Sequence, residues 1–267
     1  MEQLPSMTHI KNLEQRITHY WNSIPCNSLN SNTDNTDIEY FKQISRNRYF
    51  VESHIPTFAE FNKSKGLRVL EIGCGIGTDA AEFARHGANY TGIDISSNSI
   101  DMAKRRFELE NLEGQFCIMN ASDLKSLELL EKFDLIYSFG VLHHYPEINQ
   151  IIDNIQKCLV NNGKFKFMVY ARNSWKYAMI QQGLDQYEAQ SDCPFAEVYT
   201  AEDIHLLLDK KFKINTIKQA HCFMYNVEKY KKYIYELEPW FQNMSIPMRN
   251  AVQEQLGWHL LIDSEKN

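Results

Sequence analysis

Apolar and polar residues follow a regular order of short strands and amphipathic helices that begins at Leu67. Short apolar runs rich in β-branched or aromatic residues predict strands, whereas apolar residues spaced three and four apart predict helices. The predicted strands are Arg68–Gly73, Asn89–Ile95, Gly114–Asn120, Phe133–Gly140, Lys164–Tyr170, Lys213–Gln219 and Trp258–Asp263. The predicted helices between them are Thr78–His86, Ser96–Glu110, Ile148–Leu159 and Glu202–Lys210, with a turn at Asn161-Asn162-Gly163. This alternation predicts a doubly wound α/β fold, with a mostly parallel sheet covered on both faces.

Further helical patterns lie outside this alternation. They precede the first strand at His9–Trp21 and at Ile38–Asn62, which is interrupted near Pro56, and they recur at Asn173–Gln190, Val227–Glu238 and Pro247–Leu256. Ligands of open α/β sheets bind beyond the carboxyl ends of the strands. We therefore expect residues 1–66 to form an N-terminal helical cap. Residues 67–267 are expected to form one ligand-binding domain, with insertions near 171–200 and 221–257 that also cover the site.

Composition and charge narrow the class of protein. The 267 residues are 43% hydrophobic and 23% charged, as in globular proteins, and their net charge of −6 disfavours a nucleic-acid partner. No apolar run approaches the ~20 residues of a membrane-spanning helix, and the first twenty residues lack the apolar core of a secretory signal. The six scattered cysteines form no C-x-x-C pair and fit thiols in a reducing compartment. Together these features predict a cytoplasmic protein without a membrane partner.

The sharpest motif is the glycine-rich segment Glu71–Gly77, which directly follows the first strand and opens a helix. Alternate glycines let the backbone turn tightly and approach a ligand, and the helix start offers N–H groups to a carboxylate or phosphate. A dinucleotide site requires G-x-G-x-x-G, but Thr78 stands at the third glycine of that pattern. Glu71 also suits a cationic ligand better than a pyrophosphate. Asp94 and Ile95 at the end of the second strand fit a ribose and an adenine, as they would in either class of nucleotide site.

Three motifs in order resemble those of the Rossmann-type (class I) S-adenosylmethionine-dependent methyltransferases. They are Arg68–Asp79, Gly92–Ser96 and Ser138–His144, and the small-molecule branch with ubiquinone and menaquinone methyltransferases is the most similar part of that superfamily. The match covers about Leu67–Tyr170, and Gly257–Ile262 resembles the antiparallel last strand of the fold. The resemblance implies S-adenosyl-L-methionine as the cofactor.

The resemblance and the strand ends together identify the expected cofactor contacts. The expected contacts are Glu71, Gly73 and Gly75 for the methionine portion, Asp94 and Ile95 for the ribose and adenine, Asn120 and Ala121 for the adenine amino group, and Ser138 and Phe139 for the sulfonium. The family often has an aspartate where this chain has Asn120. The amide oxygen of Asn120 can still accept a hydrogen bond, but the contact loses its charge.

His143 and His144 lie just past the fourth strand, where a histidine could remove a proton from the methyl acceptor. The alternative is that they brace the loop. Even with Glu147 they form no complete metal-ligand set, so the sequence predicts no metal site. The residues predicted to contact the acceptor are Tyr20, Arg48, Tyr49, Tyr170, Arg172 and Tyr199, for which packing is the alternative role.

The sequence thus predicts an enzyme that transfers a methyl group to an oxygen or nitrogen of a small molecule. An RNA or protein methyltransferase is the first alternative, which a basic face beside the site would favour. The second is a nucleotide-binding dehydrogenase or a non-catalytic binding module. Fold alone does not decide among these functions.

Overall fold

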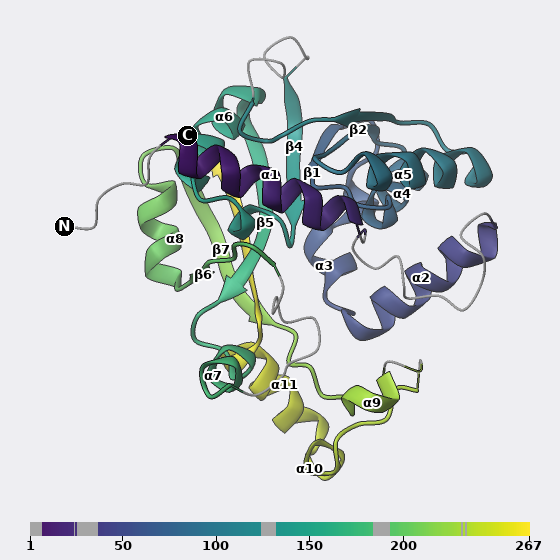
Figure 1. The fold of residues 1–267 in the computed structure, drawn as a ribbon, viewed down its shortest axis with the longest axis vertical. Coiled ribbons are helices and arrows are strands. Elements are labelled where there is room, and N and C mark those ends of the chain that lie inside the picture. Colours follow the sequence, from purple (N-terminus) through teal and green to yellow (C-terminus); the bar gives the residue numbers. More distant parts are fainter. Residues whose placement is uncertain are drawn as a thin grey trace.

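The strands form a single mixed sheet in the computed structural model, which describes residues 7–23, 25, 37–123, 132–183, 193–230, 232 and 234–267. The described strands are β1 (Arg68–Ile72), β2 (Asn89–Asp94), β3 (Gln115–Ile118), β4 (Phe133–Phe139), β5 (Leu159–Ala171), β6 (Val198–Tyr199), β7 (Phe212–Ala220) and β8 (His259–Lys266). Their order is β3-β2-β1-β4-β5-β8-β7, and the short β6 pairs with β5 (Figure 1).

Strand directions follow the predicted doubly wound pattern. β1 pairs in parallel with β2 and β4, β2 with β3, and β4 with β5. β8 inserts antiparallel between β5 and β7. The fold prediction of a mostly parallel sheet with an antiparallel last strand is therefore confirmed.

The helices divide into those that cover the sheet and those added to it. The covering helices are α4 (Thr78–Arg85), α5 (Ser97–Glu110), α6 (Ile148–Cys158) and α8 (Ala201–Leu208). The added helices are α1 (Met7–Ser23), α2 (Ile38–Val51), α3 (Ile55–Ala59), α7 (Trp175–Gln181), α9 (Val227–Tyr230), α10 (Pro239–Gln242) and α11 (Ile246–Leu256), with short 3-10 turns η1 (Phe61–Lys63) and η2 (Leu142–His144).

Side chains that alternate along each strand divide the core into two layers. In β1, Leu70 joins the buried cluster that contains Ile151 of α6 and Ile204 of α8. Its neighbour Val69 joins the opposite cluster, with Phe83 of α4 and Phe107 of α5. The near-continuous apolar run of this strand thus reflects a sheet that is buried on both faces.

Several predicted boundaries are wrong. The predicted turn Asn161-Asn162-Gly163 lies inside β5, where Asn162 has φ 59° and the pairing with β4 shifts register, so the turn residues form a bulge instead of a reversal. Helix Val227–Glu238 ends at Tyr230, and an isolated bridge joins Tyr225 to Leu237. Of the predicted helix Asn173–Gln190, 175–181 are helical and 184–190 lie outside the described residues. The two-residue β6 was not predicted.

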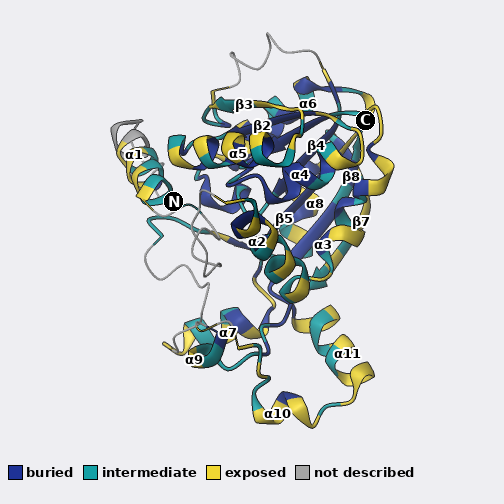
Figure 2. Ribbon diagram, turned by 90° about the vertical axis from the view of Figure 1, so that its right-hand side faces the viewer, coloured by how far each residue is buried: buried dark blue, intermediate teal, exposed yellow. Residues whose placement is uncertain are grey.

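The predicted helix Ile38–Asn62 breaks into α2, α3 and η1. The break precedes Pro56, which occupies the first turn of α3, because proline lacks the N–H that a continuing helix would need. α2 contacts α4 and α5, and α1 contacts α5. Figure 2 shows α7, α9, α10 and α11 beyond one end of the sheet, away from α1. Among the described residues, no helix has both the length and the apolar character needed to cross a membrane.

Candidate active site

The glycine loop between β1 and α4 adopts backbone conformations that favour glycine. Gly73, Gly75 and Gly77 have φ of 76°, 52° and 78°, which side chains other than glycine rarely adopt. A Cβ on Gly73 would lie 2.2 Å from Cγ2 of Val141, whereas a Cβ on Gly75 would meet no protein atom within 4 Å. The loop is therefore closely packed against η2 at its first glycine and open toward the pocket at its second.

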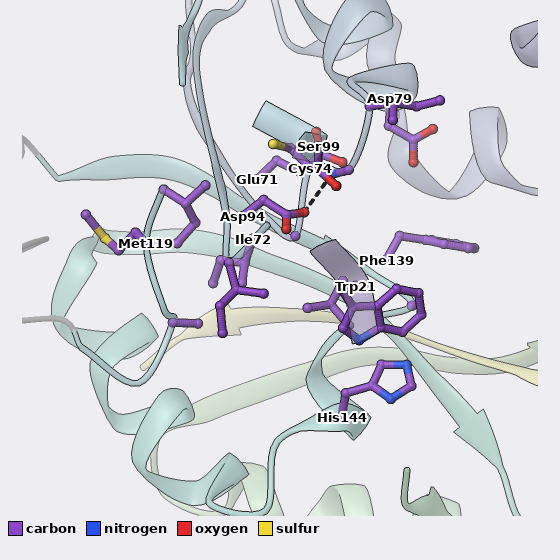
Figure 3. A pocket seen from close by; sticks show the side chains of 18 of the residues that line it. Trp21, Glu71, Ile72, Cys74, Asp79, Asp94, Ser99, Met119, Phe139 and His144 are labelled. Carbon is purple, nitrogen blue, oxygen red and sulfur yellow. Dashed lines mark hydrogen bonds between the residues drawn. The ribbon is translucent and has the colours of Figure 1, made fainter. Parts of the chain in front are cut away.

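Asp94 at the end of β2 faces this loop. Its carboxylate accepts hydrogen bonds from the backbone N–H groups of Gly75 and Ser96, both at 2.9 Å (Figure 3). Burial raises the pKa of Asp94, and the backbone donors, Ser96 first, partly oppose that shift. The carboxylate thus links the glycine loop to the neighbouring strand end, where it was predicted to meet a ribose.

Glu71 is a second buried carboxylate beside the loop. The Tyr90 hydroxyl donates a hydrogen bond to it at 2.5 Å. Burial is the main cause that raises the pKa of Glu71 well above its usual value, and the nearby charge of Asp79 adds to the shift. A ligand cation next to Glu71 would favour its charged form. The site therefore fits an ammonium or sulfonium group.

Asp79 in the first turn of α4 holds α2 against the loop, a role that the sequence analysis missed. Its carboxylate accepts hydrogen bonds from Arg48 at 3.2 and 3.3 Å, Tyr49 at 3.0 Å and Tyr137 at 2.9 Å. Arg48 lies 5.3 Å from the centre of the Phe139 ring. Tyr49 thus makes a structural contact with α4 and is not among the residues that line the pocket.

The pocket formed by these elements collects most of the predicted cofactor residues. Its lining includes Glu71, Gly73, Gly75, Asp94, Ile95, Ala121 and Phe139, together with Arg48 and His144. Ser138 is fully buried and donates its hydroxyl to the Ile72 carbonyl instead. Asn120 lies in an adjoining hollow beside Ile95. The pocket also contains unpredicted apolar side chains, among them Ile17, Cys74, Met119 and Tyr145.

Helix α1 covers part of this pocket. Ile17 and Trp21 of this helix line the pocket, and the Trp21 ring packs edge-on against the His144 ring with ring centres 5.1 Å apart (Figure 3). Asn22 anchors the end of the helix, because its side-chain oxygen accepts hydrogen bonds from the Ser97 hydroxyl and the Asn98 backbone N–H. Tyr20, the predicted contact, lines a separate outer hollow instead.

The two candidate histidines have different surroundings. His144 lines the pocket, and its Nδ1 lies 2.8 Å from the Phe195 carbonyl oxygen. Its Nε2 is buried and has no hydrogen-bond partner among the described residues. His143 does not line the pocket, and its ring centre lies 3.7 Å from that of Tyr170. Burial lowers the pKa of His143 well below its usual value and that of His144 to about 4.

Three predicted acceptor contacts, Tyr170, Arg172 and Tyr199, are not among the residues that line the pocket. Tyr170 stacks on Trp258 with ring centres 4.2 Å apart. Arg172 donates to the Val198 carbonyl at 3.0 Å and lies near Glu197. Tyr199 lines a different hollow. Arg172 and Tyr199 are therefore separated from the residues that surround the glycine loop.

Comparison with known proteins is consistent with this geometry. The chain is 33% identical over 117 residues to the ubiquinone biosynthesis O-methyltransferase of Coxiella burnetii, with coverage of 42% of this chain and 47% of that protein. It is 32% identical over 123 residues to the fatty-acid O-methyltransferase of Mycolicibacterium smegmatis, with coverage of 45% and 43%. The matched region thus spans just under half the length of these curated relatives.

Solved structures share this type of fold at low sequence identity. Magnesium protoporphyrin IX methyltransferase from Synechocystis PCC 6803, solved with bound S-adenosylmethionine, gives a TM-score of 0.59 over 100% of both chains at 14% identity. An N-methyltransferase from Bradyrhizobium japonicum gives 0.51 over 82% of this chain and 97% of that one, at 19% identity.

A match to a protein family covers more than half of the chain. The family described as "Methyltransferase domain" matches residues 43–212, which contain the glycine loop, Asp94 and both candidate histidines. The predicted resemblance to class I S-adenosylmethionine-dependent methyltransferases is confirmed by this match. The chain belongs to the methyltransferase domain family.

Proposed function

We propose that the chain is an S-adenosylmethionine-dependent methyltransferase that acts on an oxygen or nitrogen of a small molecule. The observation that supports this best is the pair of carboxylates beside the glycine loop, the buried Glu71 and the half-buried Asp94. Glu71 can pair with a ligand cation, and Asp94 can accept hydrogen bonds from ribose hydroxyls. The two carboxylates in one pocket therefore fit the sulfonium and adenosyl groups of S-adenosylmethionine better than a pyrophosphate. The relatives whose names include O-methyltransferase support the same choice.

The residues present fit this cofactor. Glu71 and the loop at Gly73 and Gly75 would bind the methionine portion, while Asp94 would bind the ribose. A Cβ at Gly75 would project into open space, which leaves room for a ligand against the backbone. S-adenosylmethionine, when bound, supplies an electrophilic methyl group on positive sulfur. The chain's own task is then to place the acceptor in line and to exclude water.

His144 is the residue that we propose contacts the acceptor. Its Nε2 is buried without a partner among the described residues, and its ring lines the pocket. Because burial lowers the pKa of His144 to about 4, the imidazole is neutral at pH 7. It can accept a hydrogen bond from an O–H or N–H of the acceptor and take up that proton as the methyl group is transferred.

The cap is part of the proposal. Residues 1–66 would close over the cofactor through Ile17 and Trp21 of α1 and Arg48 of α2, which border the pocket. Insertions near 171–200 and 221–257 would shape the acceptor side. A cytoplasmic location remains a prediction drawn from the scattered cysteines.

An acceptor screen tests the proposed function directly. Purified protein is incubated with methyl-labelled S-adenosylmethionine and either metabolite extract or purified RNA, and label transfer is measured. We expect label in small molecules. Label found in RNA alone would instead favour the macromolecular alternative.

With an acceptor identified, His144→Gln is compared with His205→Ala, an exposed histidine on α8. Loss of the proton acceptor should lower turnover by roughly 10²–10⁴ and leave S-adenosylhomocysteine affinity unchanged. The turnover of the wild type should rise with pH around the His144 pKa of about 4. Wild-type turnover in His144→Gln would contradict the proposed role of this residue.

A further inference from the structure

A cluster of three histidines and one glutamate lies next to Phe139, which also lines the cofactor pocket. Glu52 follows α2, His54 precedes α3, His221 follows β7 and His259 begins β8. The ring centres of His259 and His54 lie 5.3 and 6.1 Å from that of Phe139. His221 and His259 are 2% and 4% exposed. The cofactor pocket and this cluster therefore share Phe139 as a wall.

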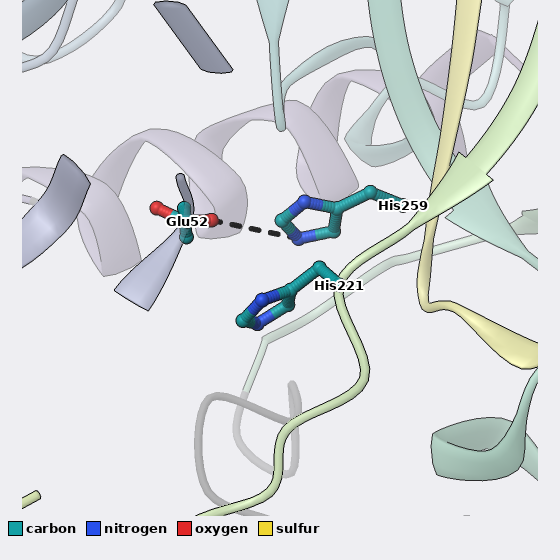
Figure 4. Close-up of side chains that lie close together, drawn as sticks. All are labelled: Glu52, His221 and His259. Carbon is teal, nitrogen blue, oxygen red and sulfur yellow. Dashed lines mark ion pairs between the residues drawn. The ribbon is translucent and has the colours of Figure 1, made fainter. Parts of the chain in front are cut away.

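The polar atoms of the cluster converge. One possible ligand atom from each of Glu52, His221 and His259 lies within 4.8 Å of the other two. Figure 4 shows the two imidazoles side by side with the carboxylate opposite them. Nε2 of His259 lies 3.6 Å from Oε1 of Glu52, and the ring centres of His221 and His259 lie 4.5 Å apart.

Both imidazoles also have a partner outside this convergence. His221 forms a hydrogen bond with the backbone of Val51, while its Nε2 is buried and has no hydrogen-bond partner among the described residues. Nδ1 of His259 lies 3.0 Å from Nε2 of His54. Metal-binding histidines are typically held in this way, with one ring nitrogen bonded to a carbonyl or side chain and the other free for the ion.

Two cationic side chains, Arg48 and Lys176, lie near the cluster. Arg48 lies 3.5 Å from Glu52 and also pairs with Asp79, while Lys176 is placed with its Nζ 5.5 Å from the Trp258 ring. Burial is the main cause that lowers the pKa of His221 and His259, and Lys176 and Arg48 contribute. The histidines are therefore neutral at pH 7, which is the form that binds a metal.

We propose that Glu52, His221 and His259 bind one divalent transition-metal ion, for which Zn²⁺ is the natural probe. Two histidines and a glutamate are an established zinc ligand set, and three protein ligands leave a coordination position open. Tetrahedral bonds of about 2.1 Å place ligand atoms roughly 3.4 Å apart. The ligand atoms here lie within 4.8 Å of one another, so side-chain rotations must bring the widest pair closer by up to about 1.4 Å.

A competition titration tests this site on the full-length, metal-stripped protein. A chromophoric chelator reports how much Zn²⁺ the protein removes from it. The wild type is expected to bind one Zn²⁺ with micromolar or tighter affinity, and His221→Ala and His259→Ala to weaken that affinity at least tenfold. His86→Ala and His205→Ala, at two exposed histidines, are matched controls that should retain wild-type binding.

X-ray absorption of the zinc-loaded wild type gives a result that needs no variant. Histidine nitrogen and carboxylate oxygen should surround the ion, whereas a spectrum dominated by sulfur would overturn the site. Equal zinc binding by the wild type and the His221→Ala His259→Ala double variant would overturn it as well. S-adenosylhomocysteine calorimetry on the same preparations separates the two proposals, because cofactor binding without zinc binding contradicts only the metal site.

Discussion

The cofactor pocket and the histidine cluster, which both include or contact Phe139, are built in different ways. In the pocket, Glu71 and Asp94 lie near the ends of the adjacent parallel strands β1 and β2, in which Glu71 pairs with Gly92, and one short loop leads from β1 to α4. In the cluster, His54, His221 and His259 come from three segments far apart in the sequence. The pocket thus depends on local backbone geometry, whereas the cluster depends on how the added segments pack.

The strongest test of this difference is substitution of Gly73 by alanine. The new Cβ would lie 2.2 Å from Val141, at φ 76°. We expect a loss of about 3 kcal/mol in the free energy of unfolding and roughly 100-fold weaker S-adenosylhomocysteine binding, measured by urea unfolding and calorimetry.

Gly66→Ala is the matched control. Gly66 has the same φ of 76° but no atom within 4 Å of its Cβ position. Only the backbone strain of about 1–2 kcal/mol should appear, with cofactor affinity unchanged. Equal losses of affinity in both variants would show that the close approach to η2 is unimportant.

Acid should destabilise the fold through two histidines, His54 in the cluster and His144 in the cofactor pocket. Burial lowers the pKa of His54 and of His144 to about 4, against about 6.5 when unfolded. Between these values the unfolded chain binds more protons, so stability falls as pH drops from 6.5 toward 4. The pKa of Glu71 is raised, so its contribution has the opposite sign.

At pH 4.5 we expect His54 and His144 each to lower the free energy of unfolding by about 2–3 kcal/mol relative to pH 7. Urea unfolding of His54→Gln should therefore show a shallower pH dependence than the wild type. His205→Ala, on the surface of α8, should show the wild-type slope. An identical slope in His54→Gln would contradict the pKa assignment.

Helix α1 gives a smaller effect that tests the cap. Trp21 lines the pocket, whereas its neighbour Tyr20 lines an outer hollow. Trp21→Ala should weaken S-adenosylhomocysteine binding roughly tenfold, and Tyr20→Ala should leave it unchanged. Backbone amides of α1 should exchange more slowly when the ligand is bound. Unchanged exchange together with equal affinities would contradict closure by this helix.

The sequence predicted the sheet and the cofactor loop because both depend on short contiguous patterns. The apolar run Arg68–Ile72, the glycines that follow it and the acid at the next strand end are all local signals. Arg48 and His144, which were predicted to contact the acceptor and to act as the base, both line the pocket. For His144 this follows from the rule that ligands of open α/β sheets bind beyond the carboxyl ends of the strands.

The remaining features depend on tertiary packing. Asp79 is the last residue of the motif Arg68–Asp79, but its hydrogen bonds to α2 could not be inferred, because no local pattern specifies how α2 packs. Arg172 and Tyr199 were expected near the acceptor because they follow β5, yet Tyr199 lines another hollow and Arg172 donates a hydrogen bond to the Val198 carbonyl of β6. The sequence predicted no metal site because only the neighbours of His143 and His144 suggested ligands. The converging cluster comes instead from Glu52, His221 and His259, which are distant in the sequence.

Calorimetry with S-adenosylhomocysteine is the most direct test of the central claim that Glu71, Asp94 and the glycine loop form a cofactor site. The wild type and the exposed-site control Asp101→Asn should bind one ligand per chain, and Asp94→Asn should bind at least tenfold more weakly because its carboxylate would bind the ribose. NAD should give no binding heat. Tight NAD binding without a response to S-adenosylhomocysteine would contradict the account.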